Sequence, residues 1–396
     1  MRDLGTVVRG IRTPIIKEND DLESIVVDSL MKASKNNKFE FHDKDVVAIT
    51  EAVVGISEGN YVTVDEVADD IKKKFNNPKE LGIVFPILSR NRFSIILKAI
   101  ARSTKKLYVL VSFPSDEVGN GILDEAVLEE SKFNLGSIIT EQEYFETFGE
   151  WLHPFTGINM ISFYKKLIED EGCKPVFILS NKATDILKYT KNVLTCDIHT
   201  RFKTKKSFEN YKDVTVYGLH EIMTSPTKNS GYNEKYGLLG SNKSTEERLK
   251  LFPRTGQKLV NGIQKRLKEL TGCTIEVMVY GDGAFRDPVG KIWELADPVV
   301  SPAYTKGLEG TPNEIKLKYV SDNKFDNLRG DELKDAIKEE IKKKDKDLKG
   351  KMITQGTTPR RLTDLIGSLC DLTSGSGDKG TPIVLVQGYF DNFTSK

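Results

Sequence analysis

The stretch TVVRGIRTPIIKENDDLESIVVDSL, residues 6–30, joins a strand pattern to a helix pattern and so indicates the fold class. β-Branched residues dominate 6–13, which is typical of a strand. A helix is predicted over 19–33, with Asn19 or Asp20 as its N-cap and apolar residues at helical spacing, at positions 22, 25, 26 and 30. A strand that runs directly into a helix is the repeating unit of α/β folds.

The same alternation of strand and helix signals continues along the chain. Apolar runs rich in β-branched residues predict strands over 45–56, 80–88, 106–114, 274–280 and 381–389. Helices are predicted over 90–104 and 256–272, the second ending at Gly272. We therefore predict an α/β (mixed α+β) fold in which helices flank mixed sheets.

The pattern is less regular in the middle of the chain, which suggests a division into three parts. Residues 1–130 form a predicted N-terminal α/β part, and 216–396 form a C-terminal α/β part. Between them, 131–215 is predicted to be an inserted or enlarged segment with strands of its own. Residues 224–245 are rich in Ser, Thr, Asn and Gly, and long polar loops of this kind often bind ligands.

Composition restricts the class of partner. The 396 residues include 59 basic and 58 acidic ones, so no overall field attracts nucleic acid or an anionic membrane. No apolar stretch has the length of a signal peptide core or a membrane span, and a cytoplasmic location is expected. The four cysteines are far apart and indicate neither a zinc site nor a disulfide framework. The charged helix predicted at 330–351 is interpreted as a solvated surface helix.

The densest group of charges follows the predicted strand 274–280, in the stretch YGDGAFRDPVGKIWELADP, residues 280–298. Asp282 and Asp297 are predicted to bind a divalent cation, because Mg²⁺ usually takes one or two protein carboxylates besides phosphate oxygens and water. Arg286 and Lys291 are predicted to contact phosphate. The alternative is a salt-bridged turn without a ligand.

Three further clusters are candidates for the same chemistry. Arg90 and Arg92 are candidates for binding an anion, and Asp116 for binding a metal or an amine, although charges at helix ends are often only solvated. The stretch GLLGSNKS, residues 237–244, resembles a phosphate loop but lacks its last glycine. A polar binding loop remains possible there, with Ser241, Asn242 and Lys243 as contacts, and ordinary surface is the alternative.

Both ends of the chain carry motifs of a known family. IRTPIIKENDDLESIVVDSL followed by DVVAITEAVVGISEGNYV resembles the opening of the coenzyme F420-0:L-glutamate ligases, the gamma-glutamyl ligase family. VMVYGDGAFRDPVG is similar to that family's strand followed by an Asp and a turn. RRLTDLIGSLCDLTSGSGDKGTPIVLVQG resembles its closing helix, glycine turn and strand. The longer middle of the chain indicates a long, divergent subtype.

The resemblance implies a gamma-glutamyl ligase-like fold with an enlarged middle segment, and a homodimer dependent on GTP (or ATP) and on Mg²⁺ or Mn²⁺. It implies that L-glutamate is joined as a γ-glutamyl amide to a cofactor-like carboxylate through an acyl phosphate. The acceptor would be a deazaflavin F420 precursor or a folate. Asp282, Arg286 and Glu51 would then serve catalysis, and Glu58 would support or bind the metal.

The chain also departs from the family pattern at several positions. Ala52 follows Glu51 where the family commonly has Lys, and NSGYNEKYG, residues 229–237, stands where the family has an acidic turn. Phe285 and Asp287 replace Gly and Pro. These departures leave two other hypotheses open: a protein of the same fold that binds nucleotide without catalysis, and a protein-interaction module.

Overall fold

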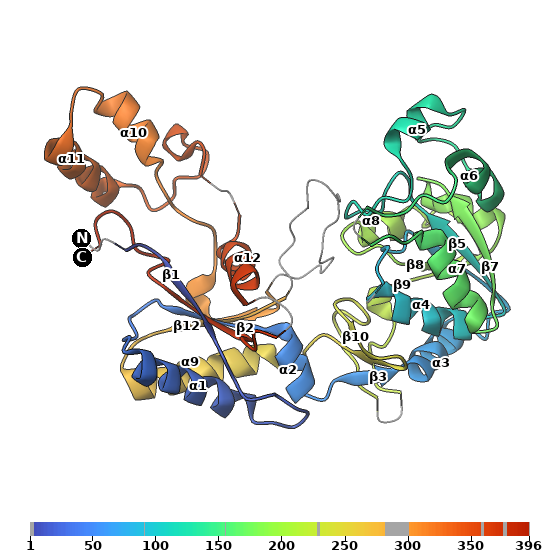
Figure 1. The fold of residues 1–396 in the computed structure, drawn as a ribbon, viewed down its shortest axis with the longest axis horizontal. Helices are drawn as coiled ribbons and strands as arrows, with labels where there is room; N and C mark the ends of the chain where they lie inside the picture. The colour runs from blue at the N-terminus through green and yellow to red at the C-terminus, as the bar shows by residue number, and fades with distance from the viewer. Residues whose placement is uncertain are drawn as a thin grey trace. The chain divides into compact units, whose positions relative to one another are not determined.

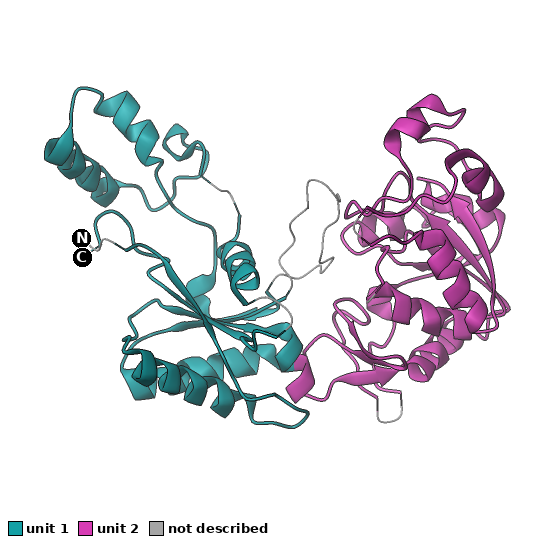
Figure 2. Cartoon of the chain, viewed as in Figure 1, with its two compact units in different colours: residues 1–54, 255–283, 300–396 teal, residues 55–254, 284–299 magenta. Residues whose placement is uncertain are grey.

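The computed structural model describes residues 4–90, 92–154, 156–227, 230–281, 301–357, 360–374 and 378–395. The fold is mixed α/β, as predicted. The chain divides into two compact units, shown in Figure 2: unit 1 comprises residues 1–54, 255–283 and 300–396, and unit 2 comprises 55–254 and 284–299. Unit 2 is wider than the predicted middle segment 131–215, because strands before residue 131 pair with strands inside that segment.

Unit 1 is built on one five-stranded sheet (Figure 1). Its strands lie in the order β1 (Val7–Ile11), β14 (Ile383–Gln387), β2 (Val46–Thr50), β12 (Glu276–Tyr280) and β13 (Ala303–Tyr304). β2 and β12 are parallel, and the other neighbouring pairs are antiparallel. β12 and β14 are buried along their whole length, which explains their continuous apolar sequences.

Helices cover both faces of this sheet. α1 (Leu22–Asn37) and α9 (Gly256–Thr271) lie together on one face, and α12 (Leu362–Ser374) covers the other (Figure 1). Ile366 and Cys370 of α12 pack on the apolar side chains of β2, β12 and β14. Gly272 ends α9 with a left-handed φ of 76°, as predicted.

Two local predictions in unit 1 were wrong. The N-cap of α1 is Asp21, whose carboxylate accepts the backbone N–H of Ser24 at 3.1 Å, and not Asn19 or Asp20. The strand predicted over 45–56 ends at Thr50, and α2 (Glu51–Ser57) follows it directly. A short apolar run with β-branched residues fits a buried strand and a buried helix equally well, so the pattern alone could not locate this change.

A smaller helical part of unit 1 contains α10 (Leu317–Lys324) and α11 (Gly330–Lys343). The short helical turn η3 (Lys306–Leu308) precedes these helices in the chain, and η4 (Met352–Thr354) follows them. Ile337 and Ile341 of α11 are buried against Val320 of α10, in a core that also holds Ile315 and Leu348. The helix predicted as a solvated surface helix therefore has one buried stripe, while its charged residues form pairs such as Lys338 with Asp335.

Unit 2 contains a six-stranded sheet in the order β6 (Ile139–Thr140), β7 (Lys174–Leu179), β5 (Lys106–Val111), β4 (Glu80–Val84), β8 (Asn192–Thr195) and β9 (Thr215–Gly218). All neighbouring strands are parallel except β6. The main core lies on one face, under α3 (Val64–Lys74), α4 (Phe93–Arg102) and α7 (Met160–Asp170). The other face packs on η1 (Ala183–Lys188) and on Phe208, which follows α8 (Arg201–Lys206).

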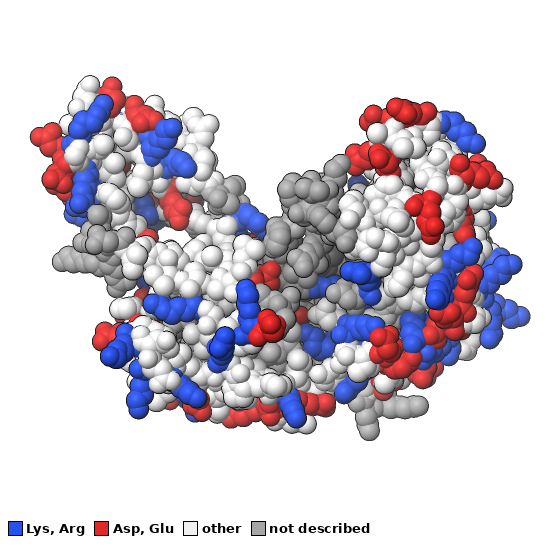
Figure 3. Space-filling model, viewed as in Figure 1, with Lys and Arg blue, Asp and Glu red and all other residues white. Residues whose placement is uncertain are grey.

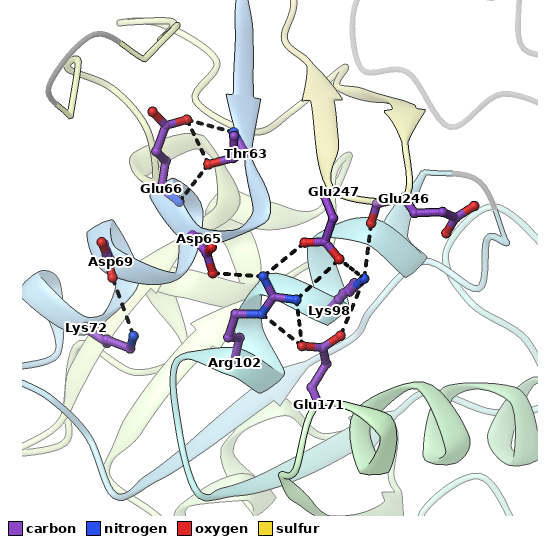
Figure 4. Close-up of polar contacts among 10 residues, drawn as sticks. All are labelled: Thr63, Asp65, Glu66, Asp69, Lys72, Lys98, Arg102, Glu171, Glu246 and Glu247. Carbon is purple, nitrogen blue, oxygen red and sulfur yellow. Dashed lines mark hydrogen bonds and ion pairs between the residues drawn. The ribbon is translucent and has the colours of Figure 1, made fainter.

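The remaining elements of unit 2 are α5 (Glu125–Glu130), α6 (Glu141–Phe148), η2 (Leu219–Glu221) and a small antiparallel sheet. That sheet has the order β10 (Asn242–Thr245), β11 (Arg248–Lys250), β3 (Tyr61–Thr63). Arg102 of α4 makes ion pairs with Asp65, Glu171 and Glu247, and so ties α3, α4, the end of α7 and the β10–β11 hairpin together (Figure 4).

The first and last residues of the long stretch 55–254 are held together within unit 2. β3 pairs with β11, so that Tyr61 lies opposite Lys250. Leu251 donates its N–H to the carbonyl of Asn60 at 2.8 Å, and Arg254 donates its N–H to the Glu58 carboxylate at 2.9 Å. The chain therefore enters and leaves this unit through one small hydrogen-bonded region.

Candidate functional site at one edge of the unit 1 sheet

The strands that carry the family motifs end at the same edge of the unit 1 sheet. Ile11, at the end of β1, lies opposite Ile383, at the start of β14. Ile383 also lies opposite Ile49 of β2, and Thr50 lies opposite Tyr280, at the end of β12. Hence the segments that follow β1, β2 and β12 begin at one edge of the sheet, and the segment that precedes β14 ends there.

Backbone hydrogen bonds join these segments. The N–H of Thr50 donates to the carbonyl of Pro382 at 3.0 Å, so the end of β2 touches the segment that leads into β14. The N–H of Thr13 donates to the carbonyl of Gly380 at 3.4 Å, which links the segment after β1 to the same turn. Motifs separated by most of the chain are therefore neighbours in space.

Glu51 is the candidate catalytic residue that the structure places at this edge. It is the first residue of α2, immediately after β2, and its side chain is only 2% exposed. Gly281 follows β12, the parallel neighbour of β2. Glu51 and the charged stretch that starts after Gly281 thus leave adjacent strands. The other candidates of that stretch, Asp282, Arg286, Lys291 and Asp297, lie outside the described residues.

A cavity of about 1190 Å³ opens beside the end of β1. Residues 9–14, side chains of α1, and Thr373, Lys379 and Thr381 line it. Its charged lining groups are Arg9, Arg12, Lys32, Lys379 and one carboxylate, Asp28. Arg9 donates to the Gln387 side chain at 2.6 Å and lies 4.9 Å from the centre of the Phe39 ring. The carboxylate of Asp28 lies 3.8 Å from Arg266. The positive excess suits an anionic ligand.

Three of these cations are available to such a ligand. Arg12, Lys32 and Lys379 are exposed, and none of them pairs with a carboxylate within the described ranges. On the face drawn in Figure 3, by comparison, Lys and Arg are interspersed with Asp and Glu. Sequence reasoning missed these cations because only the pairing of β1 with β14 brings Arg12 and Lys379 to one cavity.

Asp116, a predicted metal ligand, belongs to unit 2 and is buried there. Its two carboxylate oxygens accept four hydrogen bonds: from the N–H of Leu88, of Val118 and of Asn120, and from the Asn120 side-chain amide, at 2.7–3.0 Å. Burial raises the pKa of Asp116 to about 6. This set of donors favours a structural role for Asp116 over the predicted metal role.

The other predicted residues of unit 2 do not gather into one site. Ser241 and Arg92 line the same cavity, but its volume of about 30 Å³ has room for little more than a water molecule. Neither Arg90, which is exposed, nor Lys243 lines it. Lys243 instead forms an ion pair with Glu246 at 2.5 Å. Asn242 begins β10, and Glu58 accepts the N–H of Arg254.

A complete metal centre is not present in the described part of the chain. Within those residues no group of three or more His, Cys, Asp or Glu side chains is placed to hold an ion. Glu51 is the one predicted acidic residue described at the edge where β2 and β12 end.

Comparison with known proteins identifies the sequence pattern. The family model described as F420-0:Gamma-glutamyl ligase matches residues 10–388, nearly the whole chain. No curated protein matches the sequence. Among the described residues, no helix combines the length and the apolar character that a membrane span requires.

Proposed function

The chain belongs to the F420-0:gamma-glutamyl ligase family, and we propose that it is a nucleotide- and divalent-metal-dependent ligase that joins L-glutamate to a cofactor-like carboxylate through a γ-glutamyl amide. The acceptor would be a deazaflavin F420 precursor, with a folate as the alternative acceptor. The observation that carries the proposal is the meeting of the family motifs at one edge of the unit 1 sheet, beside a cationic cavity.

The proposed reaction has two steps. An oxygen of the acceptor carboxylate attacks the γ-phosphorus of GTP or ATP, the bond to the nucleoside diphosphate breaks, and an acyl phosphate forms. The neutral amine of L-glutamate then attacks the acyl carbon, phosphate leaves with the electron pair of the broken C–O bond, and the nitrogen loses a proton. Both steps place negative charge on phosphate oxygens, which fixed cations stabilise.

The cavity beside β1 offers cations for this task. Arg12, Lys32 and Lys379 line it and are exposed, so that each reaches a phosphate chain without first breaking an ion pair with another described residue. Glu51 lies at the same edge of the sheet, buried at the start of α2. We assign the three cations to nucleotide phosphates and Glu51 to a supporting role next to the reacting groups.

The metal requirement is part of the proposal. Mg²⁺ or Mn²⁺ would neutralise phosphate charge, and its proposed ligands are Asp282 and Asp297, with Arg286 and Lys291 as further phosphate contacts. Glu51 leaves the strand next to the one that leads to Asp282, which supports a shared location. A homodimer is also expected for the active enzyme.

The experiment is a direct assay of amide formation. The purified protein is incubated with a deazaflavin acceptor or a folate, L-glutamate, GTP or ATP, and Mg²⁺ or Mn²⁺, while mass spectrometry follows the glutamylated product and a colour assay follows phosphate. Lys379→Gln is expected to lower activity by about 10²-fold or more, as is typical when a group that stabilises developing negative charge is removed. Glu51→Gln is also expected to lower activity, because it changes the buried group next to the reacting groups. Lys349→Gln, an exposed lysine of unit 1 that does not line the cavity, should retain it.

The same assay separates the competing hypotheses. Saturable nucleotide binding without product from either acceptor would contradict the ligase and favour a binding protein of the same fold. Absence of nucleotide binding under all metal conditions would favour a protein-interaction module. Full activity in Asp282→Ala would contradict the assignment of the metal site while leaving the ligase reaction intact.

A further inference from the structure

The large sheet of unit 2 contains a reversal of strand order that commonly marks a ligand site. Along the chain, β4, β5 and β7 are added in one direction across the sheet. β8 and β9 are then added on the other side of β4. In doubly wound sheets, ligands bind outside the carboxyl ends of the strands at this point of reversal. Here it lies between β4 and β8.

A cavity of about 670 Å³ lies at these carboxyl ends, within the usual range of ligand pockets. Its lining comes from segments that directly follow the parallel strands: Phe85 after β4, residues 112–117 after β5, and residues 181–184 after β7. Side chains of α8 and of the residues just after it complete the wall. The cavity is therefore where the topology predicts a site.

The two carboxylates that line this cavity accept hydrogen bonds from the loops around it. Asp116 accepts four hydrogen bonds from the loops after β4 and β5. Glu117 accepts the N–H groups of His199 and Thr200, the second at 3.0 Å, and also that of Ile198. These bonds fix the loops after β4, β5 and β8 against one another. They also satisfy both carboxylates, so neither competes for a cation in the cavity.

Several hydrogen-bond donors of the cavity, in contrast, have no partner among the described residues. Within the described ranges, the side chains of Lys182, Lys203, Thr184 and Asn210 line the cavity without a hydrogen bond or ion pair to the protein. Lys182 and Lys203 are exposed at the cavity, so each can pair with an anionic group of a ligand without first breaking an ion pair with another described residue. Lysine is a common phosphate ligand because its ammonium is a compact point charge.

Aromatic side chains border the same cavity. Phe85, half-buried, lies at the carboxyl end of β4, and Tyr211, 46% exposed, lies beyond α8. The exposed ring of Tyr211 offers a face on which a planar heterocycle can stack. The site thus combines cations, neutral hydrogen-bond donors and aromatic surface.

We propose that unit 2 carries a second binding site, separate from the proposed ligase site, for a nucleoside monophosphate or a small organic phosphate of that shape. Lys182 and Lys203 bind the phosphate, and Tyr211 contacts the ring. The hydrogen bonds accepted by Asp116 and Glu117 fix the loops after β4, β5 and β8, so the cavity is open in the free protein. This site goes beyond the amide-forming reaction, which needs none of these residues.

Calorimetric titration of the full-length protein with AMP tests the site, with adenosine and inorganic phosphate as separate probes. One saturable site is expected, and the double variant Lys182→Gln with Lys203→Gln should weaken AMP binding by about tenfold or more, because it removes both cations that contact the phosphate. The matched control, Lys191→Gln with Lys206→Gln, removes two exposed lysines that do not line the cavity and should bind AMP unchanged.

Further variants keep the outcomes distinct. Tyr211→Leu should weaken AMP more than inorganic phosphate, and Arg12→Gln with Lys379→Gln in unit 1 should leave AMP binding intact while lowering ligase activity. Absence of saturable AMP binding, or full binding by the double lysine variant, would overturn the proposal. Equal affinity for AMP and inorganic phosphate would overturn the assignment of the ring to Tyr211. Loss of ligase activity alone would bear only on the unit 1 site.

Discussion

Asp116 illustrates how one buried carboxylate organises two loops. It accepts N–H groups from the loop after β4 and from the loop after β5, and it is only 5% exposed. The N–H donors favour the ionised form, whereas burial favours the neutral one. Burial outweighs the donors, so the pKa of Asp116 rises from the usual 3.8 to about 6.

This shift has a definite effect on stability. Between about pH 4 and pH 6 the native state binds the Asp116 proton and the unfolded state does not, so the contribution of Asp116 to the free energy of unfolding falls as pH rises through this window. Relative to Asp116→Asn, which does not titrate, wild-type protein should lose up to about 3 kcal/mol between pH 4 and pH 7. Urea unfolding of both proteins at several pH values measures the difference. A difference that grows with pH would mean that the hydrogen bonds outweigh burial.

Single residues of the candidate site were predictable in part. Glu51 was singled out by the family resemblance, and the structure places it at the sheet edge where the family motifs meet. Arg12 and Lys379 did not stand out, because each is an ordinary surface cation in its own stretch of sequence. Only a strand pairing between the two ends of the chain gives them a common cavity. The residues of the charged stretch from Asp282 to Asp297 remain predictions.

Among the elements, strands and helices with strong periodic patterns were predicted correctly, including β4, β5, β12, β14, α4 and α9. The sheet to which each strand belongs was not predicted, because the sequence pattern of β4 or β5 does not differ from that of β2. The order in which strands pair depends on contacts between distant parts of the chain. α2 was missed for a local reason, because its apolar sequence continues that of β2 without a break.

Gly82 marks the closest approach between β4 and the helical turn η1. A Cβ atom at this position would lie 2.6 Å from Cγ1 of Ile186 and 2.8 Å from Cγ2 of Thr190. Gly82→Ala should therefore destabilise unit 2 by about 1–3 kcal/mol through overpacking. Thermal unfolding measures this, with Gly5→Ala as the control, because a methyl added at this exposed glycine of unit 1 meets no atom and should leave stability unchanged. Unchanged stability of Gly82→Ala would show that η1 moves freely from the sheet.

The ion-pair network around Arg102 joins four elements (Figure 4). Its partner Glu171 is only 14% exposed, so the pair is better shielded than an ordinary surface pair. Arg102→Gln should lower the free energy of unfolding by about 1 kcal/mol or more, and by less at high salt. Lys72→Gln, which removes the exposed pair with Asp69 in the same view, should have almost no effect. Equal effects of the two substitutions in urea unfolding would contradict a cooperative network.

At the scale of the molecule, the chain consists of two units with separate cores. The sequence indicated an enlarged middle but not its limits, because no change in composition marks residue 55 or residue 254. Those limits follow from which strands share a sheet. β4 and β5 both precede the predicted insertion, and they still pair with β8 and β7 inside it.

Separate cores predict separate unfolding. Differential scanning calorimetry should resolve two transitions, since each unit buries its own apolar residues. Gly82→Ala should lower the midpoint of one transition, that of unit 2, and leave the other in place. A single transition that shifts as a whole in this variant would mean that the two cores unfold cooperatively.

The hydrogen-bonded region where the chain enters and leaves unit 2 has a consequence for how such a protein arises. The pairing of β3 with β11 holds the two ends of residues 55–254 close together. These residues can therefore be inserted or deleted as one piece of coding sequence without separating the flanking parts of unit 1. A gene in which codons 55–254 are replaced by a short glycine-serine spacer should still encode a folded ligase-like unit. Residues 55–254 could then change during evolution while the sequence of unit 1 is conserved.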